Sequence, residues 1–182
     1  GGAPELESLV DITGIPFFTA PMSRGIVPED HAVSFQGARS MALRNADVVL
    51  VVGTRFNWML NYGRRFSDDA RIIQVDIDSA EIAHNRDVDL GIVGDAKVVL
   101  GQMVGEAETR GSSFAGALES PWVVGLREDN DRRAAQLAPL LNSNDSPIHP
   151  LRICKEIRDF LDRDAILCVD GNEILHFGRQ SL

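Results

Sequence analysis

The chain has 182 residues, of which 44% are hydrophobic and 25% are charged, and its formal net charge is −9 at pH 7. This length can bury one good hydrophobic core, while the negative charge argues against nucleic acid or an anionic membrane as a partner. The sequence shows no membrane-length apolar run and no secretory leader, and its two cysteines, Cys154 and Cys168, lack a metal-binding spacing, so we expect a cytoplasmic protein.

The first third of the sequence predicts helices and strands in alternation: a helix at 5–11, a strand at 15–18, a helix capped by Ser34 at 34–45 and a strand at Val48–Val52. A loop rich in proline and glycine fills residues 19–31. The run Val48–Val52 is apolar throughout, contains four β-branched residues and ends at Gly53. Such a run is typical of a strand that is covered on both faces of a parallel sheet.

The middle of the sequence continues this alternation, with strands at Arg71–Asp76 and Leu90–Val93, a helical turn at 79–83 and a helix at 96–105 that Asp95 can cap. Residues 105–120 are small and polar and predict a surface excursion. Strands that alternate with helices indicate an α/β fold with a doubly wound, Rossmann-like parallel sheet. We expect about five or six strands, with Val48–Val52 and Arg71–Asp76 as neighbours.

The last third of the sequence begins with a helix at Pro121–Leu141, capped by Ser120, and a linker at 142–150. A further helix follows, and a strand is expected at 166–169. The helix should turn four side chains inward, those of Leu151, Cys154, Ile157 and Leu161. This closing unit is too small to bury a core of its own. We therefore expect a first domain at 1–141 and the incomplete beginning of another at 151–182, in a chain that starts at Gly1 and Gly2 as a piece of a longer polypeptide.

The residues that follow the predicted strands form a candidate nucleotide site, because ligands of open α/β sheets bind beyond the carboxyl ends of the strands. Backbone N–H groups and a guanidinium at 53–55 can meet a diphosphate. An acid at 76–78 can accept ribose hydroxyls, and residues 95–96 can border an adenine. The candidate residues are Gly53, Thr54, Arg55, Asp76, Ile77, Asp78, Asp95 and Ala96.

Structural alternatives exist for these and other residues. Arg55 can instead cap a helix end or pair with Asp47 or Asp76, and Asp95 can serve only as a helix cap. The aromatic and apolar side chains after Arg55 favour packing against a neighbouring domain or subunit; they are Phe56, Trp58, Leu60 and Tyr62. The four histidines show no ligand spacing and predict no histidine metal site.

Several motifs in sequence order resemble one enzyme family. They read GIPFFTAPMSRGIVPEDH, ADVVLVVGTRF, RIIQVDIDSAEIAHNR and GIVGDA. Together they look like the central domain of thiamine-diphosphate-dependent enzymes of the acetolactate synthase, 2-hydroxyacyl-CoA lyase and oxalyl-CoA decarboxylase group. The closing stretch HPLRICKEIRDFLDRDAILCVDG resembles the linker and the first strand of the cofactor-diphosphate domain of that group.

The resemblance implies a full-length enzyme that makes or breaks a carbon–carbon bond next to a carbonyl, with thiamine diphosphate and Mg²⁺ as cofactors. It also implies a small-molecule substrate, the remaining domains of the same polypeptide as partners, and assembly into a dimer or tetramer. The turn at Gly171, Asn172 and Glu173 corresponds to residues that touch thiamine diphosphate. Some members hold ADP or FAD in this central domain.

The same family uses an activating glutamate in an upstream domain and a downstream Gly-Asp-Gly magnesium motif, and neither is found in this sequence. We therefore expect the chain to be inactive by itself. Two other classes stay open: an independent nucleotide-binding regulatory domain, and a sirtuin-like NAD-dependent enzyme. The unfinished C-terminal unit argues against the first, and the lack of paired CxxC motifs argues against the second.

Overall fold

The computed structural model describes residues 1–181, without the side chains of residues 172–175 and 179. The chain divides into two compact units, Gly1–Asp129 and Asn130–Leu182, each with its own internal packing. The candidate nucleotide residues all belong to the first unit.

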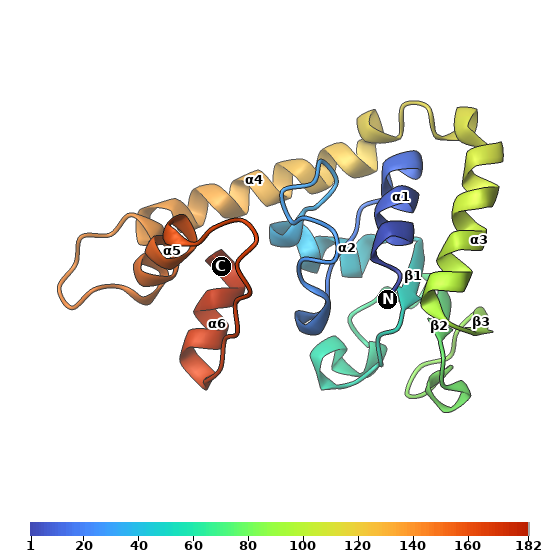
Figure 1. Cartoon of the computed structure of the whole chain (residues 1–182), viewed down its shortest axis with the longest axis horizontal. Coiled ribbons are helices and arrows are strands. Elements are labelled where there is room, and N and C mark those ends of the chain that lie inside the picture. The colour runs from blue at the N-terminus through green and yellow to red at the C-terminus, as the bar shows by residue number, and fades with distance from the viewer. Residues whose placement is uncertain (182) are drawn as a thin grey trace. The chain divides into compact units, whose positions relative to one another are not determined.

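The first unit is built on a parallel sheet of three strands, β1 (Val48–Val52), β2 (Arg71–Asp76) and β3 (Leu90–Val93), in the order β1-β2-β3 (Figure 1). Val52 lies opposite Val75 in one pair of strands, and Asp76 lies opposite Val93 in the other. The predicted α/β class and the parallel pairing of β1 with β2 are confirmed.

The predicted number of strands is wrong for the part of the chain that the structure describes. Residues 15–18 form only an isolated bridge between Phe17 and Ser34, because Pro16 has no N–H group with which to continue a ladder. Residues 166–169 pair with no described strand, and Ile166 is 94% exposed. An extended apolar run becomes a strand only beside a partner that accepts and donates its backbone hydrogen bonds.

Six α-helices complete the described chain: α1 (Ala3–Thr13), α2 (Arg39–Asn45), α3 (Ala96–Thr109), α4 (Pro121–Leu141), α5 (Pro150–Phe160) and α6 (Asn172–Ser181). Two predicted caps are confirmed, since Asp95 accepts from the N–H groups of Lys97 and Val98, and Ser120 Oγ accepts from Val123 N at 3.3 Å. The predicted helix at 34–45 exists as α2, but its predicted start at Ser34 is wrong. A 3₁₀ turn at Gln36–Ala38 comes first, because Phe35 is buried in a non-helical conformation.

Both faces of the sheet are covered, as the continuous apolar run of β1 predicts. Leu50 and Val52 point to one face, where α1 and α3 pack against each other through Leu9 and Leu100 (Figure 1). The opposite face carries Val51, against which the segment after β1 packs. The buried side chains on that face are Val51, Phe56, Leu60, Phe66 and Ile72.

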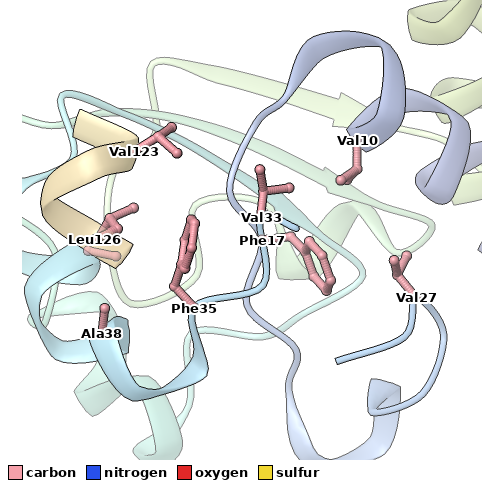
Figure 2. Packing of buried hydrophobic residues seen from close by; sticks show 9 residues of the cluster. Val10, Phe17, Val27, Val33, Phe35, Ala38, Val123 and Leu126 are labelled. Atoms are coloured by element: carbon pink, nitrogen blue, oxygen red, sulfur yellow. The ribbon is translucent and has the colours of Figure 1, made fainter. Parts of the chain in front are cut away.

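A second layer of core joins α1 to the start of α4. Figure 2 shows side chains from α1, the following loop, the α2 region and α4 pointing toward one another, with Phe17, Phe35 and Leu126 among them. These contacts bring the first two turns of α4 into the first unit, which ends at Asp129 within that helix.

The second unit contains the rest of α4 together with α5 and α6. Leu151 and Cys154 are buried as predicted, whereas Ile157 is exposed and Leu161 is half-buried. The exposure of Ile157 corrects the prediction: the buried residues of α5 are Leu151 and Cys154, in its first half. The assignment of 142–150 as a linker and of 151–182 as the start of another domain stays a prediction.

The backbone requires glycine at position 63. Gly63 has a φ of +80°, and a Cβ atom there would lie 2.8 Å from Arg86 Cβ, while Arg86 is fixed by hydrogen bonds to the carbonyls of Gly63, Phe66 and Ser67. We expect Gly63→Ala to lower the free energy of unfolding by about 2–4 kcal/mol, through left-handed strain together with overpacking. Urea unfolding measures this loss.

The matched control is Gly105→Ala, in a helical position of α3 where an added Cβ meets open space. That substitution should raise stability by about 0.5–1 kcal/mol. A Gly63→Ala variant as stable as the wild type would contradict the argument.

Candidate functional site

The residues that follow β1, β2 and β3 lie side by side at one edge of the sheet. Gly53 N donates to Val75 O at 2.8 Å, and Gly94 N donates to Asp76 O at 2.9 Å. The parallel register therefore ends the three strands at the same level. The structure thus brings together the three predicted segments 53–55, 76–78 and 95–96, which are separated in sequence. We call these three segments the row.

The first of these segments is open to solvent. Gly53 has a φ of +59°, and a Cβ atom placed there would meet nothing within 4 Å. Arg55 is 66% exposed, and its Nε lies 3.0 Å from Glu81 Oε1, so neither Asp47 nor Asp76 is its partner. Among the described residues, the two terminal nitrogens of Arg55 form no hydrogen bond.

The second segment is a tight turn in which the carboxylates of its two aspartates accept hydrogen bonds from backbone N–H groups. Asp76 Oδ1 accepts from Asp78 N at 3.0 Å, and Asp78 Oδ1 accepts from Ala80 N at 2.9 Å. Within the described chain, the Oδ2 atom of each acid has no hydrogen-bond partner. Ile77 lies between them with its side chain exposed. The turn therefore presents two carboxylate oxygens and one apolar side chain to solvent.

The third segment begins α3. Asp95 Oδ1 accepts from Lys97 N at 2.9 Å and from Val98 N at 3.3 Å, so Asp95 is a helix cap. Ala96 is half-buried in the first turn, and Val93 and Val98 beside it are exposed. This end of the row thus combines one acid with apolar surface.

Sequence reasoning missed two residues that build the site, Gln74 and Glu81. Gln74 lies in β2 with 0% exposure; its Nε2 donates to Glu81 O and its Oε1 accepts from Ala83 N, both at 2.9 Å. The available signal was a glutamine within an apolar strand, since a buried amide needs partners for both of its ends. These two bonds fix the loop that carries Glu81.

The apolar segment after Arg55 corrects another prediction. Phe56 and Leu60 are buried in the first unit, where they cover the sheet, rather than presented to a neighbouring domain or subunit. Trp58 and Tyr62 are exposed, and the prediction that they pack against a neighbour stays a prediction.

Two depressions in the first unit are lined by residues outside the row. One, of about 300 Å³, borders α1 and includes His31, whose Nε2 lies 2.9 Å from Asp11 Oδ1. The other, of about 500 Å³, includes Arg71 at the opposite, amino end of β2. Neither depression contains any of the eight candidate nucleotide residues.

The predicted thiamine diphosphate residues lie in the second unit. Gly171 has a φ of +95°, and its N–H donates to Asp170 Oδ1 at 2.7 Å. The side chains of Asn172 and Glu173 lie outside the described residues. Across the part that the structure describes, no cluster of three His, Cys, Asp or Glu residues can hold a metal ion, and no helix is long and apolar enough to cross a membrane.

Comparison of the sequence with known proteins shows the family to which the chain belongs. Residues 1–103 match the model of the central domain of thiamine pyrophosphate enzymes. The chain is 38% identical over 173 residues to 2-hydroxyacyl-CoA lyase of Arabidopsis thaliana, an alignment that covers 92% of this chain and 28% of that protein. It is 32% identical over 178 residues to oxalyl-CoA decarboxylase of Escherichia coli K12, covering 96% of this chain and 31% of that protein.

A probable acetolactate synthase of Mycobacterium bovis is 32% identical over 166 residues, covering 91% of this chain and 29% of that protein. The chain thus spans about a third of the length of these curated relatives. Because the family model covers more than half of the chain, the chain belongs to the thiamine pyrophosphate enzyme family and contains its central domain.

Proposed function

We propose that this chain is the nucleotide-binding central part of an enzyme that uses thiamine diphosphate and Mg²⁺ to make or break a carbon–carbon bond next to a carbonyl. The full-length enzyme acts on a small molecule, as 2-hydroxyacyl-CoA lyases or acetolactate synthases do, and forms a homo-oligomer in the cytoplasm. The observation that carries the nucleotide site is the convergence of 53–55, 76–78 and 95–96 at the carboxyl edge of the sheet.

Each part of this row suits one part of ADP or of the ADP half of FAD. The exposed guanidinium of Arg55 and the open backbone at Gly53 suit the diphosphate. The Oδ2 atoms of Asp76 and Asp78 can accept from ribose hydroxyls. Ile77 and Ala96, with Asp95 at their border, offer the partly apolar surface that an adenine ring needs.

Among the described residues, no group of three His, Cys, Asp or Glu side chains could hold a metal ion, and Asp170 Oδ1 accepts from Gly171 N. Thiamine diphosphate, when bound, would supply an electron sink for negative charge on the former carbonyl carbon of the substrate. For this chain we propose only that the turn at Gly171, Asn172 and Glu173 contacts that cofactor. The remaining domains of a longer polypeptide would hold its metal.

Calorimetric titration of the chain with ADP, FAD and CoA tests the nucleotide site. We expect ADP or FAD to bind with saturation at one site per chain. CoA is included because it carries an adenosine diphosphate with an additional 3′-phosphate. The absence of heat with all three ligands, confirmed by equilibrium dialysis, would contradict a nucleotide site.

We expect the chain alone to show no turnover of pyruvate or of a 2-hydroxyacyl-CoA in the presence of thiamine diphosphate and Mg²⁺. A cofactor without its metal clamp is neither held nor oriented for reaction. Product formation is measured by chromatography, with the Arabidopsis thaliana 2-hydroxyacyl-CoA lyase as the positive control. Turnover that disappears when thiamine diphosphate is omitted would show that the chain is catalytic by itself.

A further inference from the structure

Arg55 forms one ion pair in the described part of the chain, and the contact is made by its Nε atom. Glu81 Oε1 lies 3.0 Å from Nε, while the two terminal nitrogens form no hydrogen bond with any described residue. A guanidinium is planar and carries five N–H donors in a fixed arrangement. A partner at Nε therefore restricts the plane of the group and leaves terminal donors available to a ligand.

Glu81 is better fixed than the arginine that it contacts. Its side chain is 20% exposed, against 66% for Arg55. Its backbone is held at both groups, because Glu81 N donates to Asp78 O at 3.1 Å and Glu81 O accepts from the buried amide of Gln74. The Glu81 carboxylate thus belongs to a part of the loop that is hydrogen-bonded to Gln74 of β2.

We propose that Glu81 is a positioning residue of the nucleotide site, which orients the Arg55 guanidinium so that its terminal nitrogens face the phosphate groups of the ligand. The inference rests on the proposed nucleotide site and adds a residue to it. An exposed arginine loses side-chain freedom when it binds phosphate, and a contact that orders it beforehand removes part of that cost. The expected gain in affinity is about 3- to 10-fold, which corresponds to the free-energy cost of ordering one long side chain on binding.

The negative charge of Glu81 works in the opposite direction, since it repels the phosphates of the ligand. Solvent screens part of this repulsion because Arg55 is exposed, whereas salt screens little at distances below the Debye length of about 8 Å at physiological ionic strength. The two effects are separated by Glu81→Gln and Glu81→Ala. Both variants lose the charge, but only glutamine keeps a side-chain oxygen in the place of Glu81 Oε1, which lies 3.0 Å from Arg55 Nε.

The experiment measures the Kd of ADP and of FAD by calorimetry at 0.15 M salt, a value of about physiological ionic strength. We expect Glu81→Gln to bind about 3- to 10-fold more tightly than Glu81→Ala. The difference should vanish when both substitutions are made in an Arg55→Ala background, as a double-mutant cycle requires of a coupled pair. A general loss of folding would not depend on Arg55 in this way.

The control is Glu106→Ala in α3, which removes the partner of another exposed arginine, Arg110, directly after that helix, where the two side chains lie 2.6 Å apart. This variant should bind the nucleotide as the wild type does. Equal affinities of Glu81→Gln and Glu81→Ala, with the wild type binding normally, would overturn the positioning role and leave the nucleotide site intact. A wild type that binds neither ADP nor FAD would overturn both proposals.

Discussion

Replacing Arg55 with alanine is expected to weaken the binding of ADP or FAD by roughly tenfold to a hundredfold. A hydrogen bond from a charged group to phosphate contributes about 1.5–3 kcal/mol, and about 1.4 kcal/mol corresponds to a factor of ten in Kd. The thermal stability of the chain should hardly change. Arg55 is 66% exposed, and an ion pair at such a site contributes little to the free energy of unfolding.

The matched control for this prediction is Arg110→Ala. Arg110 is also 66% exposed and also pairs with a glutamate, but it lies at the C-terminal end of α3, away from the row. Calorimetry with ADP and FAD, with thermal unfolding in parallel, compares the two variants with the wild type. Unchanged binding by Arg55→Ala would remove this residue from the site, and a large loss of stability would show that its role is structural.

Replacing Gln74 with leucine is expected to lower the free energy of unfolding by about 2–4 kcal/mol. The substitution leaves Glu81 O and Ala83 N without the partners that the buried amide supplies, and each backbone group left unpaired in or near the interior costs about 1–3 kcal/mol. Water can reach the exposed Ala83 and reduces the total. Nucleotide affinity should fall as well, because the same loop carries Glu81.

Urea unfolding of Gln74→Leu should be compared with that of Gln102→Leu, which makes the same change on the exposed surface of α3. The control is expected to stay within about 0.5 kcal/mol of the wild type. If the two variants unfolded at the same urea concentration, the two bonds of Gln74 would contribute nothing measurable to the fold.

The resemblance in sequence was sufficient for the family, and the comparisons confirm it. The cofactor and nucleotide roles of individual residues stay predictions, because the same residues also serve the fold. Asp95 shows this clearly: it caps α3, as one of its two sequence interpretations predicted, and that cap does not prevent its other oxygen from bordering a ligand.

The sequence by itself determined the features that depend on neighbouring residues. The apolar runs at β1, β2 and β3 and the caps at Asp95 and Ser120 follow from side-chain period and local hydrogen bonding, so they could be recognised without any tertiary information. The meeting of the three segments at the carboxyl edge followed as well, because parallel strands place all their carboxyl ends together.

Only the tertiary structure decided which distant groups meet. The partner of Arg55 is Glu81 rather than Asp47 or Asp76, because the bonds from Gln74 hold the loop after β2 beside the end of β1. The composition of the run at 166–169 predicts a strand, yet this run has no described strand to pair with. Ion pairs and strand pairings depend on how the chain returns in space, and no local pattern of residues contains that information.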